Sequence, residues 1–145
     1  YLLGCLAANS PPGGRMQRFF LRRMGLIFGR HCFFSPKLMV DPVAPENIHI
    51  GSNVFTGFGA RLFVHVVAPR TDTEKLEYNV VIGKIVVEDD VFLGAWAMVT
   101  PIKNRCVTIH RGAIVGDSTW IDRDMPAGAI VVGRPFKVIG WRGKN

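Results

Sequence analysis

The sequence predicts an all-β protein, a parallel β-helix built from six-residue sides, and three observations support this prediction. An aliphatic residue recurs at every sixth position from Val87 to Val99 and again from Ile109 to Ile121. A smaller residue follows most of these four positions later, as Ala97 follows Leu93. Neither the helical period of 3.6 nor the strand period of 2 produces such a pattern. Three sides would close one coil of about 18 residues, and stacked coils would lie roughly 4.8 Å apart.

The first 30 residues are expected to form a tail and a capping helix. The apolar stretch 1–8 precedes Pro11, Pro12 and two glycines, so we expect a short tail that packs on another surface, rather than the end of a targeting segment. Arg15–Phe28 is the helix candidate, with Gly29 as its stop. Such a helix either covers the open end of the coil, which is a sheet edge, or lies on an anionic membrane with its basic face. The apolar residues of this helix at three- and four-residue spacing are Met16, Phe19, Phe20, Met24, Ile27 and Phe28.

The coil itself is expected over residues 31–140. The repeat fails at 66–80, where polar and charged residues predict a loop that leaves one corner, and again briefly at 102–106. Residues 141–145 are basic and polar, and we expect this tail to fray. The predicted inward positions of the first coils are Cys32, Leu38, Ala44, Ile50, Thr56 and Leu62, and their plus-four partners are Pro36, Pro42, Ile48, Val54 and Ala60.

Composition limits the possible classes of protein. A chain of 145 residues fits one domain, and it contains no apolar run long enough for a transmembrane helix. Its three cysteines lack metal-type spacing, which favours a reduced, cytoplasmic protein. The net charge of +7 favours an anionic ligand or surface, including peripheral membrane contact through residues 15–28. The basic residues are scattered, with no aromatic residues interleaved, which argues against nucleic acid.

Four segments resemble the hexapeptide-repeat acetyltransferases, the O-acetyltransferases of maltose, galactosides and polysaccharides. They are Ile50–Leu62 (IGSNVFTGFGARL), His65 three residues later, Gly83–Gly94 (GKIVVEDDVFLG) and Asp124–Ile139 (DMPAGAIVVGRPFKVI). Residues 21–36 look most like the capsule and exopolysaccharide enzymes. The resemblance implies a left-handed β-helix, a homotrimer with active sites between subunits, acetyl-CoA as donor, a sugar or polysaccharide-precursor hydroxyl as acceptor, and no metal.

This reaction needs a base, because an alcohol is a poor nucleophile at neutral pH. Histidine suits that role, since its unperturbed pKa is near 6.5. No Ser-His-Asp or Cys-His pattern is visible, so direct attack on the thioester is the simpler mechanism. His65 stands where the repeat becomes the loop, and the resemblance marks it as the catalytic base. His31, His49 and His110 are interpreted as surface residues, although His31 and His49, 18 positions apart, would stack on adjacent coils and could form a metal pair.

The remaining site residues rest on the resemblance. Asp41 matches a region where sugar-using relatives hold the acceptor. Basic residues near the nucleotide end would pair with phosphates, unless they are ordinary surface charges; they are Arg123, Arg134 and Lys137. Main-chain amides at two corners would hold the pantetheine arm; they belong to Gly94, Ala95, Gly116 and Ser118.

Four features depart from the family pattern. Relatives often carry a second histidine two residues after the first, where this chain has Val67. Asp117 replaces a small residue near the donor, residues 102–106 lengthen a turn, and Trp96 and Trp120 replace smaller outward residues. The tryptophans either stack on a ligand or pack where subunits of a trimer meet. Two other functions stay open. A zinc hydratase of the same fold needs three converging histidines, which the spacing does not supply. A non-catalytic scaffold or binding protein would need neither His65 nor a donor groove.

Overall fold

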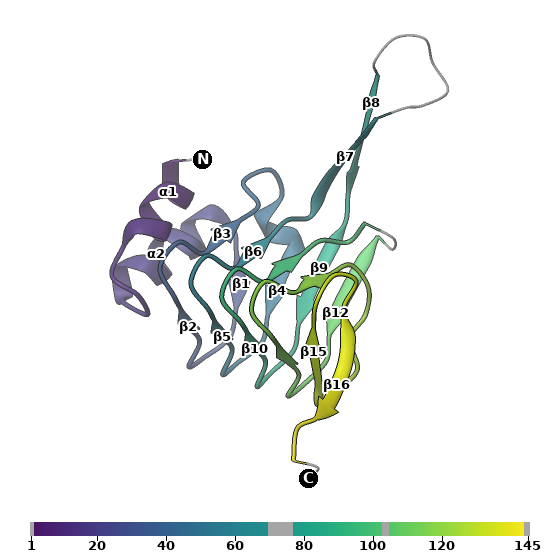
Figure 1. The fold of residues 1–145 in the computed structure, drawn as a ribbon. Coiled ribbons are helices and arrows are strands. Elements are labelled where there is room, and N and C mark those ends of the chain that lie inside the picture. The colour runs from purple at the N-terminus through teal and green to yellow at the C-terminus, as the bar shows by residue number, and fades with distance from the viewer. Residues whose placement is uncertain (1, 70–76, 103–104, 144–145) are drawn as a thin grey trace.

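The computed structural model describes residues 2–69, 77–102 and 105–143, and shows a coil of short strands with two helices at its N-terminal end (Figure 1). The helical elements are α1 (Leu2–Asn9), α2 (Arg15–Met24) and the 3-10 helix η1 (Pro45–Asn47). The strands are β1 (Ile27–Phe28), β2 (Phe33–Phe34), β3 (Met39–Val40), β4 (Ile48–Ile50), β5 (Phe55–Thr56), β6 (Arg61–Leu62), β7 (His65–Pro69), β8 (Tyr78–Ile82), β9 (Lys84–Val87), β10 (Phe92–Leu93), β11 (Met98–Val99), β12 (Cys106–Ile109), β13 (Ile114–Val115), β14 (Trp120–Ile121), β15 (Ala129–Val132) and β16 (Lys137–Trp141).

Three sheets form the sides of the coil. Sheet A has the order β1-β4-β9-β12, sheet B the order β2-β5-β10-β13-β15 with β16 added at its end, and sheet C the order β3-β6-β11-β14. The pairs within them are parallel except for β15 and β16. Along the chain the strands enter sheets A, B and C in turn, so the backbone winds as a three-sided coil. The expected mostly β architecture with parallel sheets is confirmed, whereas its left-handed winding stays a prediction.

Most of the two-residue strands turn one side chain into the coil and the other outward. Leu93 and Val115 are fully buried, for example, whereas Phe92 is 40% exposed. The inward side chains of all three sheets form one continuous hydrophobic cluster. Removing apolar surface from water stabilises such a core by roughly 25 cal/mol per Å². The residues at six-residue spacing therefore hold the coil together, as the sequence predicts.

Most coils are longer than the 18 residues expected, although the last is shorter, since Val115 pairs with Val131, 16 positions further along. Ile27 pairs with His49 and Phe92 pairs with Ile114, each 22 positions further along the chain. The inward residues of consecutive strands are six positions apart from sheet A to sheet B and from sheet B to sheet C. The extra residues lie between a strand of sheet C and the next strand of sheet A. His49 consequently lies beside Ile27 rather than beside His31, so the predicted stacking of two histidines is wrong.

The predicted phase of the first coil is also wrong. Its strands bury Phe28, Phe34 and Val40, and these pair with Ile50, Thr56 and Leu62. The residues predicted at those inward strand positions, Cys32, Leu38 and Ala44, are buried at the corners of the coil instead. Two of the predicted small partners are not buried: Pro36 is half-buried and Pro42 is exposed.

The N-terminal helices cover the first coil. Helix α2 ends at Met24, because Gly25 adopts a left-handed conformation (φ 108°) and donates its N–H to helix carbonyls, so the end predicted at Phe28 is wrong. Gln17 and Leu21 are the buried residues of α2, whereas Met16 and Phe19 of the predicted apolar face are exposed. The expected tail 1–8 is largely helical as α1. No helix within the described ranges is long and apolar enough to cross a membrane.

One corner of the coil carries all of its insertions. Between sheets C and A, η1 leaves the first coil, an antiparallel hairpin of β7 and β8 leaves the second, and the segment around Ile102 leaves the third. The hairpin projects away from the body of the molecule (Figure 1). Residues 66–69 and 78–80 of the predicted loop 66–80 belong to its two strands, and residues 70–76 lie outside the described residues. At the other end β16 reaches Trp141, where a tail was expected.

Candidate functional site

The candidate catalytic pair lies at the corner that carries the insertions. Val40 of β3 pairs with Leu62 of β6, so the residues that follow these two strands meet. Asp41 comes directly after β3, and His65 begins the hairpin three residues after β6. The paired strands β3 and β6 therefore hold both side chains at the corner where the chain leaves the coil for the hairpin.

Asp41 and His65 form a close, partly shielded pair. Nδ1 of His65 lies 2.7 Å from Oδ2 of Asp41, whose side chain is fully buried, whereas 28% of the His65 side chain is exposed. Oδ2 also accepts hydrogen bonds from the backbone N–H groups of Val64 and His65, and Oδ1 accepts one from Val43, all at 2.8 Å. The carboxylate therefore receives four hydrogen bonds and is held firmly in one orientation.

These contacts keep Asp41 ionised and determine which nitrogen of His65 donates to it. Burial by itself would raise the pKa of Asp41, but the hydrogen bonds from the backbone N–H groups and from the His65 ring outweigh it and lower the pKa below its usual value. Asp41 is thus a carboxylate that only accepts, so Nδ1 of His65 must carry the proton and donate it. Within the described residues Nε2 has no hydrogen-bond partner. A neutral imidazole of this tautomer has the lone pair of Nε2 free to accept a proton.

The prediction that Asp41 binds the acceptor stays untested, and the side chain of Asp41 faces the fold. As an acceptor ligand it should face the substrate, but it is fully buried and both of its oxygens are bonded within the fold. The pairing with His65 was missed because an 18-residue coil does not bring the two together. The register of Val40 with Leu62 is the signal that reveals it, and that register requires the length of the third side.

The amides predicted to bind pantetheine are already used by the fold. Gly94 and Gly116 donate to main-chain carbonyls of the next coil at 2.8 Å, and Ser118 donates to the carbonyl of Ala95 at 2.8 Å. The amide of Ala95 donates to Oδ1 of Asp117 at 2.8 Å. These four N–H groups have no proton left for a ligand, so the physical basis of that prediction is removed. Asp117, an apparent departure from the family pattern, is a structural acceptor at this corner.

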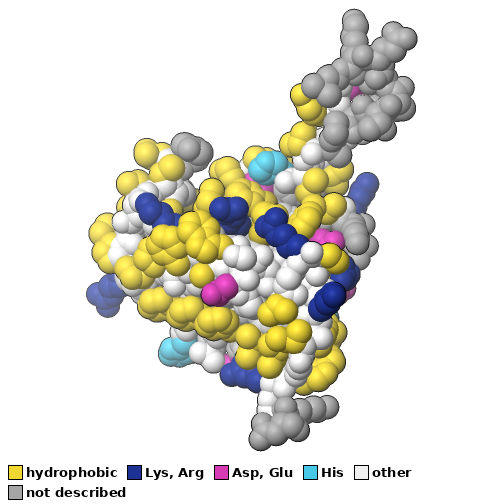
Figure 2. Space-filling model, in the orientation of Figure 1, with side chains coloured by type: hydrophobic (Ala, Val, Ile, Leu, Met, Phe, Trp, Pro, Cys, Tyr) yellow, Lys and Arg dark blue, Asp and Glu magenta, His cyan; other side chains and the backbone are white. Residues whose placement is uncertain are grey.

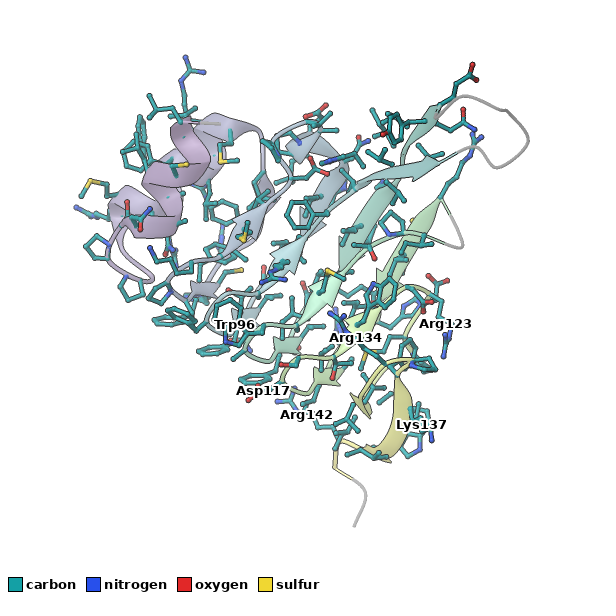
Figure 3. All side chains as sticks on the ribbon, turned by 45° about the horizontal axis from the view of Figure 1, so that its top comes forward. Trp96, Asp117, Arg123, Arg134, Lys137 and Arg142 are labelled. Carbon is teal, nitrogen blue, oxygen red and sulfur yellow. The ribbon has the colours of Figure 1, made fainter. Side chains whose placement is uncertain are left out.

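The predicted phosphate-binding residues lie together at the C-terminal end of the coil (Figure 3). Arg134 lies over the ring of Trp120, 5.4 Å from its centroid, and lines a cavity of about 400 Å³ with Ile102, Asp122 and Pro135.

The other two cations differ in their surroundings. Arg123 lies 4.2 Å from the centroid of the Phe136 ring, pairs with Asp122 at 3.0 Å and donates to the carbonyl of Phe136. Lys137 is exposed at the start of β16. Of the three, Arg134 is thus the one placed at a cavity.

Metal ligands do not converge in the part of the chain that the structure describes. No group of three His, Cys, Asp or Glu side chains there could hold a metal ion. His110 pairs with Glu88 at 3.1 Å, and Nε2 of His49 lies 3.1 Å from the carbonyl oxygen of Glu46. These two histidines bond within the fold, away from His65.

Two curated proteins resemble the chain in sequence, although no family model matches it. YvoF of Bacillus subtilis (strain 168), an acetyltransferase by provisional assignment, is 32% identical over 124 residues, which are 86% of this chain and 63% of that protein. A 2,3,4,5-tetrahydropyridine-2,6-dicarboxylate N-acetyltransferase of Staphylococcus aureus (strain JH9) is 36% identical over 89 residues, 61% of this chain and 31% of that protein. The chain thus spans less than two thirds of either relative.

Two solved structures share the fold. A maltose O-acetyltransferase from Clostridium difficile 630 matches with a TM-score of 0.68 and 18% identity, over 99% of this chain and 84% of that chain. The hexapeptide-repeat-containing acetyltransferase VCA0836 from Vibrio cholerae O1 biovar eltor, solved with acetyl-CoA, matches with a TM-score of 0.68 and 20% identity, over 99% of this chain and 85% of that chain. Together the four comparisons confirm the resemblance drawn from the sequence.

Proposed function

This chain is related in sequence and fold to the hexapeptide-repeat acetyltransferases, and on that premise we propose that it transfers an acetyl group from acetyl-CoA to a hydroxyl of a sugar or polysaccharide precursor. The single observation that carries the proposal is the buried carboxylate of Asp41 bonded to Nδ1 of His65. It fixes the tautomer in which Nε2 carries the lone pair that can accept a proton.

In the proposed reaction His65 is the general base. Nε2 accepts the proton of the acceptor hydroxyl while its oxygen attacks the thioester carbonyl carbon. The new carbon–oxygen bond forms, the carbon–sulfur bond breaks, and the proton passes from Nε2 to the departing thiolate. Asp41 does not touch the substrates; it orients the ring and stabilises the imidazolium that forms during proton transfer. A positioned base contributes ~10²- to 10⁴-fold to the rate.

The cavity beside Arg134 fits the phosphate-bearing end of coenzyme A. The guanidinium of Arg134 supplies charge, and Trp120 and Pro135 supply flat apolar surface for a nucleobase. Trp120 is fixed, because its Nε1 donates to Oγ1 of Thr100 at 2.6 Å. Arg134 is therefore our preferred phosphate ligand, with Arg123 and Lys137 in supporting positions at the same end.

An amine acceptor is the second candidate, because one of the sequence relatives is an N-acetyltransferase. The chemistry of the product separates the two. The purified protein is incubated with acetyl-CoA and a panel of saccharides and amino sugars, and acetylated products are identified by mass spectrometry before and after mild hydroxylamine treatment. An ester is cleaved by hydroxylamine and supports O-transfer, whereas an amide survives and supports N-transfer. Absence of any acetylated product would favour a non-catalytic scaffold.

The proposed assembly is a homotrimer of left-handed coils with active sites between subunits. An apolar column on the outer face of sheet B supports an interface. The rings of Phe33, Phe55 and Phe92 stack 5.2 Å and 4.9 Å apart, and Phe33 and Phe92 are each 40% exposed. Exposed apolar surface of this kind marks contact between subunits.

We further propose that the protein acts in the cytoplasm, with residues 15–28 available for peripheral membrane contact. Six of its 18 Lys and Arg residues, and none of its 11 Asp and Glu residues, fall within the first 40 positions. Phe19 and Met16 of α2 are exposed among these charges. Arg18 and Arg22 also serve the fold, since Arg18 donates to the carbonyl of Cys32 and Arg22 lies over the ring of Phe28.

A further inference from the structure

Three outward side chains alternate with buried ones where the chain runs from β6 to the hairpin. Leu62 and Val64 are fully buried, whereas the residues that alternate with them, Arg61, Phe63 and His65, are partly exposed. Phe63 meets the ring of His65 edge-on, with 6.2 Å between the ring centroids. Figure 2 shows Lys and Arg side chains among hydrophobic ones on the visible face, between the N-terminal helices and the hairpin. A guanidinium, an aromatic ring and the proposed base thus follow one another along the chain.

No acidic side chain of the described residues is paired with Arg61. Its guanidinium forms no ion pair and no hydrogen bond with them, and its Nε is buried without a partner. Across sheet C, Arg61 pairs with Met39 and Met98. Trp120 continues the same outward row beside Met98, so the outer face of these strands carries no carboxylate. A buried donor without an acceptor is unfavourable until a ligand supplies one.

Trp96 holds the guanidinium in place. Arg61 lies over the ring of Trp96, 5.5 Å from its centroid. The ring packs against the backbone of Gly59, where an added Cβ would come within 2.6 Å of it, and it meets the ring of Phe58 edge-on. The backbone of Trp96 is left-handed (φ 59°), which is unfavourable for a bulky side chain. Such strain is typical of functional sites, where surrounding contacts maintain it.

The position of Arg61 on the coil separates it from the proposed donor phosphates. Arg134 lies over Trp120 of β14, and β14 is two strands away from β6 in sheet C, roughly 10 Å along the coil axis. Arg61 precedes His65 by four residues, so at most roughly 13 Å separates their Cα atoms. If the phosphates of coenzyme A lie at Arg134 and its thioester lies at His65, only the uncharged pantetheine arm runs between them. The cation of Arg61 then remains for the acceptor.

We propose that Arg61 binds a carboxylate or phosphate group carried by the acceptor, so that the substrate class is an acidic saccharide rather than a neutral one. This inference rests on the proposed function, because it assigns His65 to the acceptor hydroxyl. A guanidinium binds such groups through two parallel N–H···O bonds, which fix the orientation of the ligand as well as its charge. Removing one charge-assisted contact of this kind should weaken binding about tenfold or more.

Chemical modification of arginines measures this site without catalysis. The protein is treated with phenylglyoxal at constant ionic strength and without acetyl-CoA, and the modification rate of each arginine is followed by peptide mass spectrometry. Inorganic phosphate and methyl β-glucuronide, each at about ten times its dissociation constant, should slow modification of Arg61 about tenfold. Methyl β-glucoside, which lacks the carboxylate, should not. Arg111, which is exposed and paired with Asp89, should react at the same rate throughout.

Two variants test the residue itself. Arg61→Met removes the charge and keeps the apolar stem, and it should weaken methyl β-glucuronide in calorimetry about tenfold or more. With an acidic acceptor the same variant should raise KM and leave kcat and acetyl-CoA affinity unchanged. Arg61→Lys keeps a charge and should recover part of the loss. Lys84→Met, the control, removes an equal charge from the exposed start of β9 and should alter none of these quantities.

The outcomes separate this inference from the proposed function. If neither inorganic phosphate nor methyl β-glucuronide protects Arg61, or if methyl β-glucoside protects it equally, the assignment is overturned whether or not acetyl transfer is found. Adenosine 3′,5′-bisphosphate, which carries phosphates of coenzyme A without its arm, should protect Arg134 only; protection of Arg61 would assign it to the donor and overturn the inference. Protection by methyl β-glucuronide in a protein that transfers no acetyl group would support the anion site and refute the proposed activity.

Discussion

Replacing Asp41 by asparagine should damage both the fold and the proposed reaction. The carboxylate accepts three hydrogen bonds at Oδ2 and one at Oδ1. If the amide oxygen of asparagine takes the place of Oδ2, its NH₂ group faces the backbone N–H of Val43, which lies only 2.8 Å from that position. A buried N–H left without an acceptor costs about 1–3 kcal/mol, and the loss of charge weakens the remaining bonds further. We expect the free energy of unfolding to fall by about 3 kcal/mol.

The effect on turnover follows from the tautomer of His65. In the opposite amide orientation the N–H groups of Val64 and His65 lose their acceptor instead, and asparagine offers an NH₂ group to Nδ1, which would place the proton on Nε2 and leave no basic nitrogen for the acceptor. In serine proteases the same replacement beside a catalytic histidine lowers kcat about 10⁴-fold. For a base that contributes ~10²- to 10⁴-fold we expect a loss of at least 10²-fold in kcat, with acetyl-CoA affinity unchanged.

A matched control separates the two effects. Asp117 also accepts a backbone N–H at 2.8 Å, from Ala95, but at a different corner from His65. Asp117→Asn should therefore lower stability without lowering kcat. Urea unfolding and steady-state kinetics are measured on both variants and the wild type. A folded Asp41→Asn protein with wild-type turnover would show that the carboxylate does not set the tautomer of His65.

Three further predictions concern acid stability, the donor and assembly. Because the pKa of Asp41 is lowered in the fold, its carboxylate stabilises the protein above its unfolded pKa of about 4, and this contribution is lost as the pH falls through the lower folded value. The difference in unfolding free energy between wild type and Asp41→Asn should thus shrink between pH 7 and pH 3 in urea titrations; a constant difference would contradict the shift. Arg134→Ala should weaken coenzyme A more than dephospho-coenzyme A in calorimetry, whereas Arg111→Ala, a control at an exposed pair with Asp89, should weaken neither; equal losses for both ligands would place Arg134 elsewhere. Sedimentation equilibrium should give three times the 16.1 kDa chain mass, and a stable monomer at micromolar concentration would contradict the trimer.

The repeat could be predicted from the sequence because inward positions must be apolar at every six-residue side. From Val87 to Val99 and from Ile109 to Ile121 the predicted inward residues are the buried ones. The first coil was misplaced for a geometric reason. The step from the third strand, at Val40, to the next strand, at Ile50, is four residues longer than six. Four residues is also the spacing between an inward strand residue and its small partner at the corner. The apparent period therefore continued unbroken from Ala44 to Ile50, although the chain had changed position.

The buried face of helix α2 could not be predicted from apolar periodicity alone. Its apolar periodicity favoured a face containing Met16 and Phe19, but the buried face includes Gln17, whose Oε1 accepts the N–H of Gly13. The local backbone donor satisfies Oε1, whereas Nε2 of Gln17 is buried without a hydrogen-bond partner in the part of the chain that the structure describes. That contact depends on how the Pro- and Gly-rich turn before the helix folds, and periodicity carries no information about it.

The candidate site was only partly predictable. His65 could be selected because it stands where the repeat stops, but its bond to Asp41 depends on which strands are paired. The amides of Gly94 and Gly116 were predicted to bind the ligand because a sequence does not show which backbone N–H groups donate to the next coil. The pairing of strands along the coil axis determines both the contact of His65 with Asp41 and the hydrogen bonds of these amides. The lengths of the insertions set that pairing.

The measurement that tests the central claim most directly is turnover of His65→Ala with acetyl-CoA and an accepted glycoside. Thiol release and product formation are followed for the wild type, His65→Ala and His110→Ala, and acetyl-CoA affinity is measured by calorimetry on the same preparations. The account predicts a folded His65→Ala protein with unchanged acetyl-CoA affinity and a kcat lowered by roughly 10²-fold or more, while His110→Ala behaves as the wild type. Wild-type turnover in a folded His65→Ala protein would contradict it.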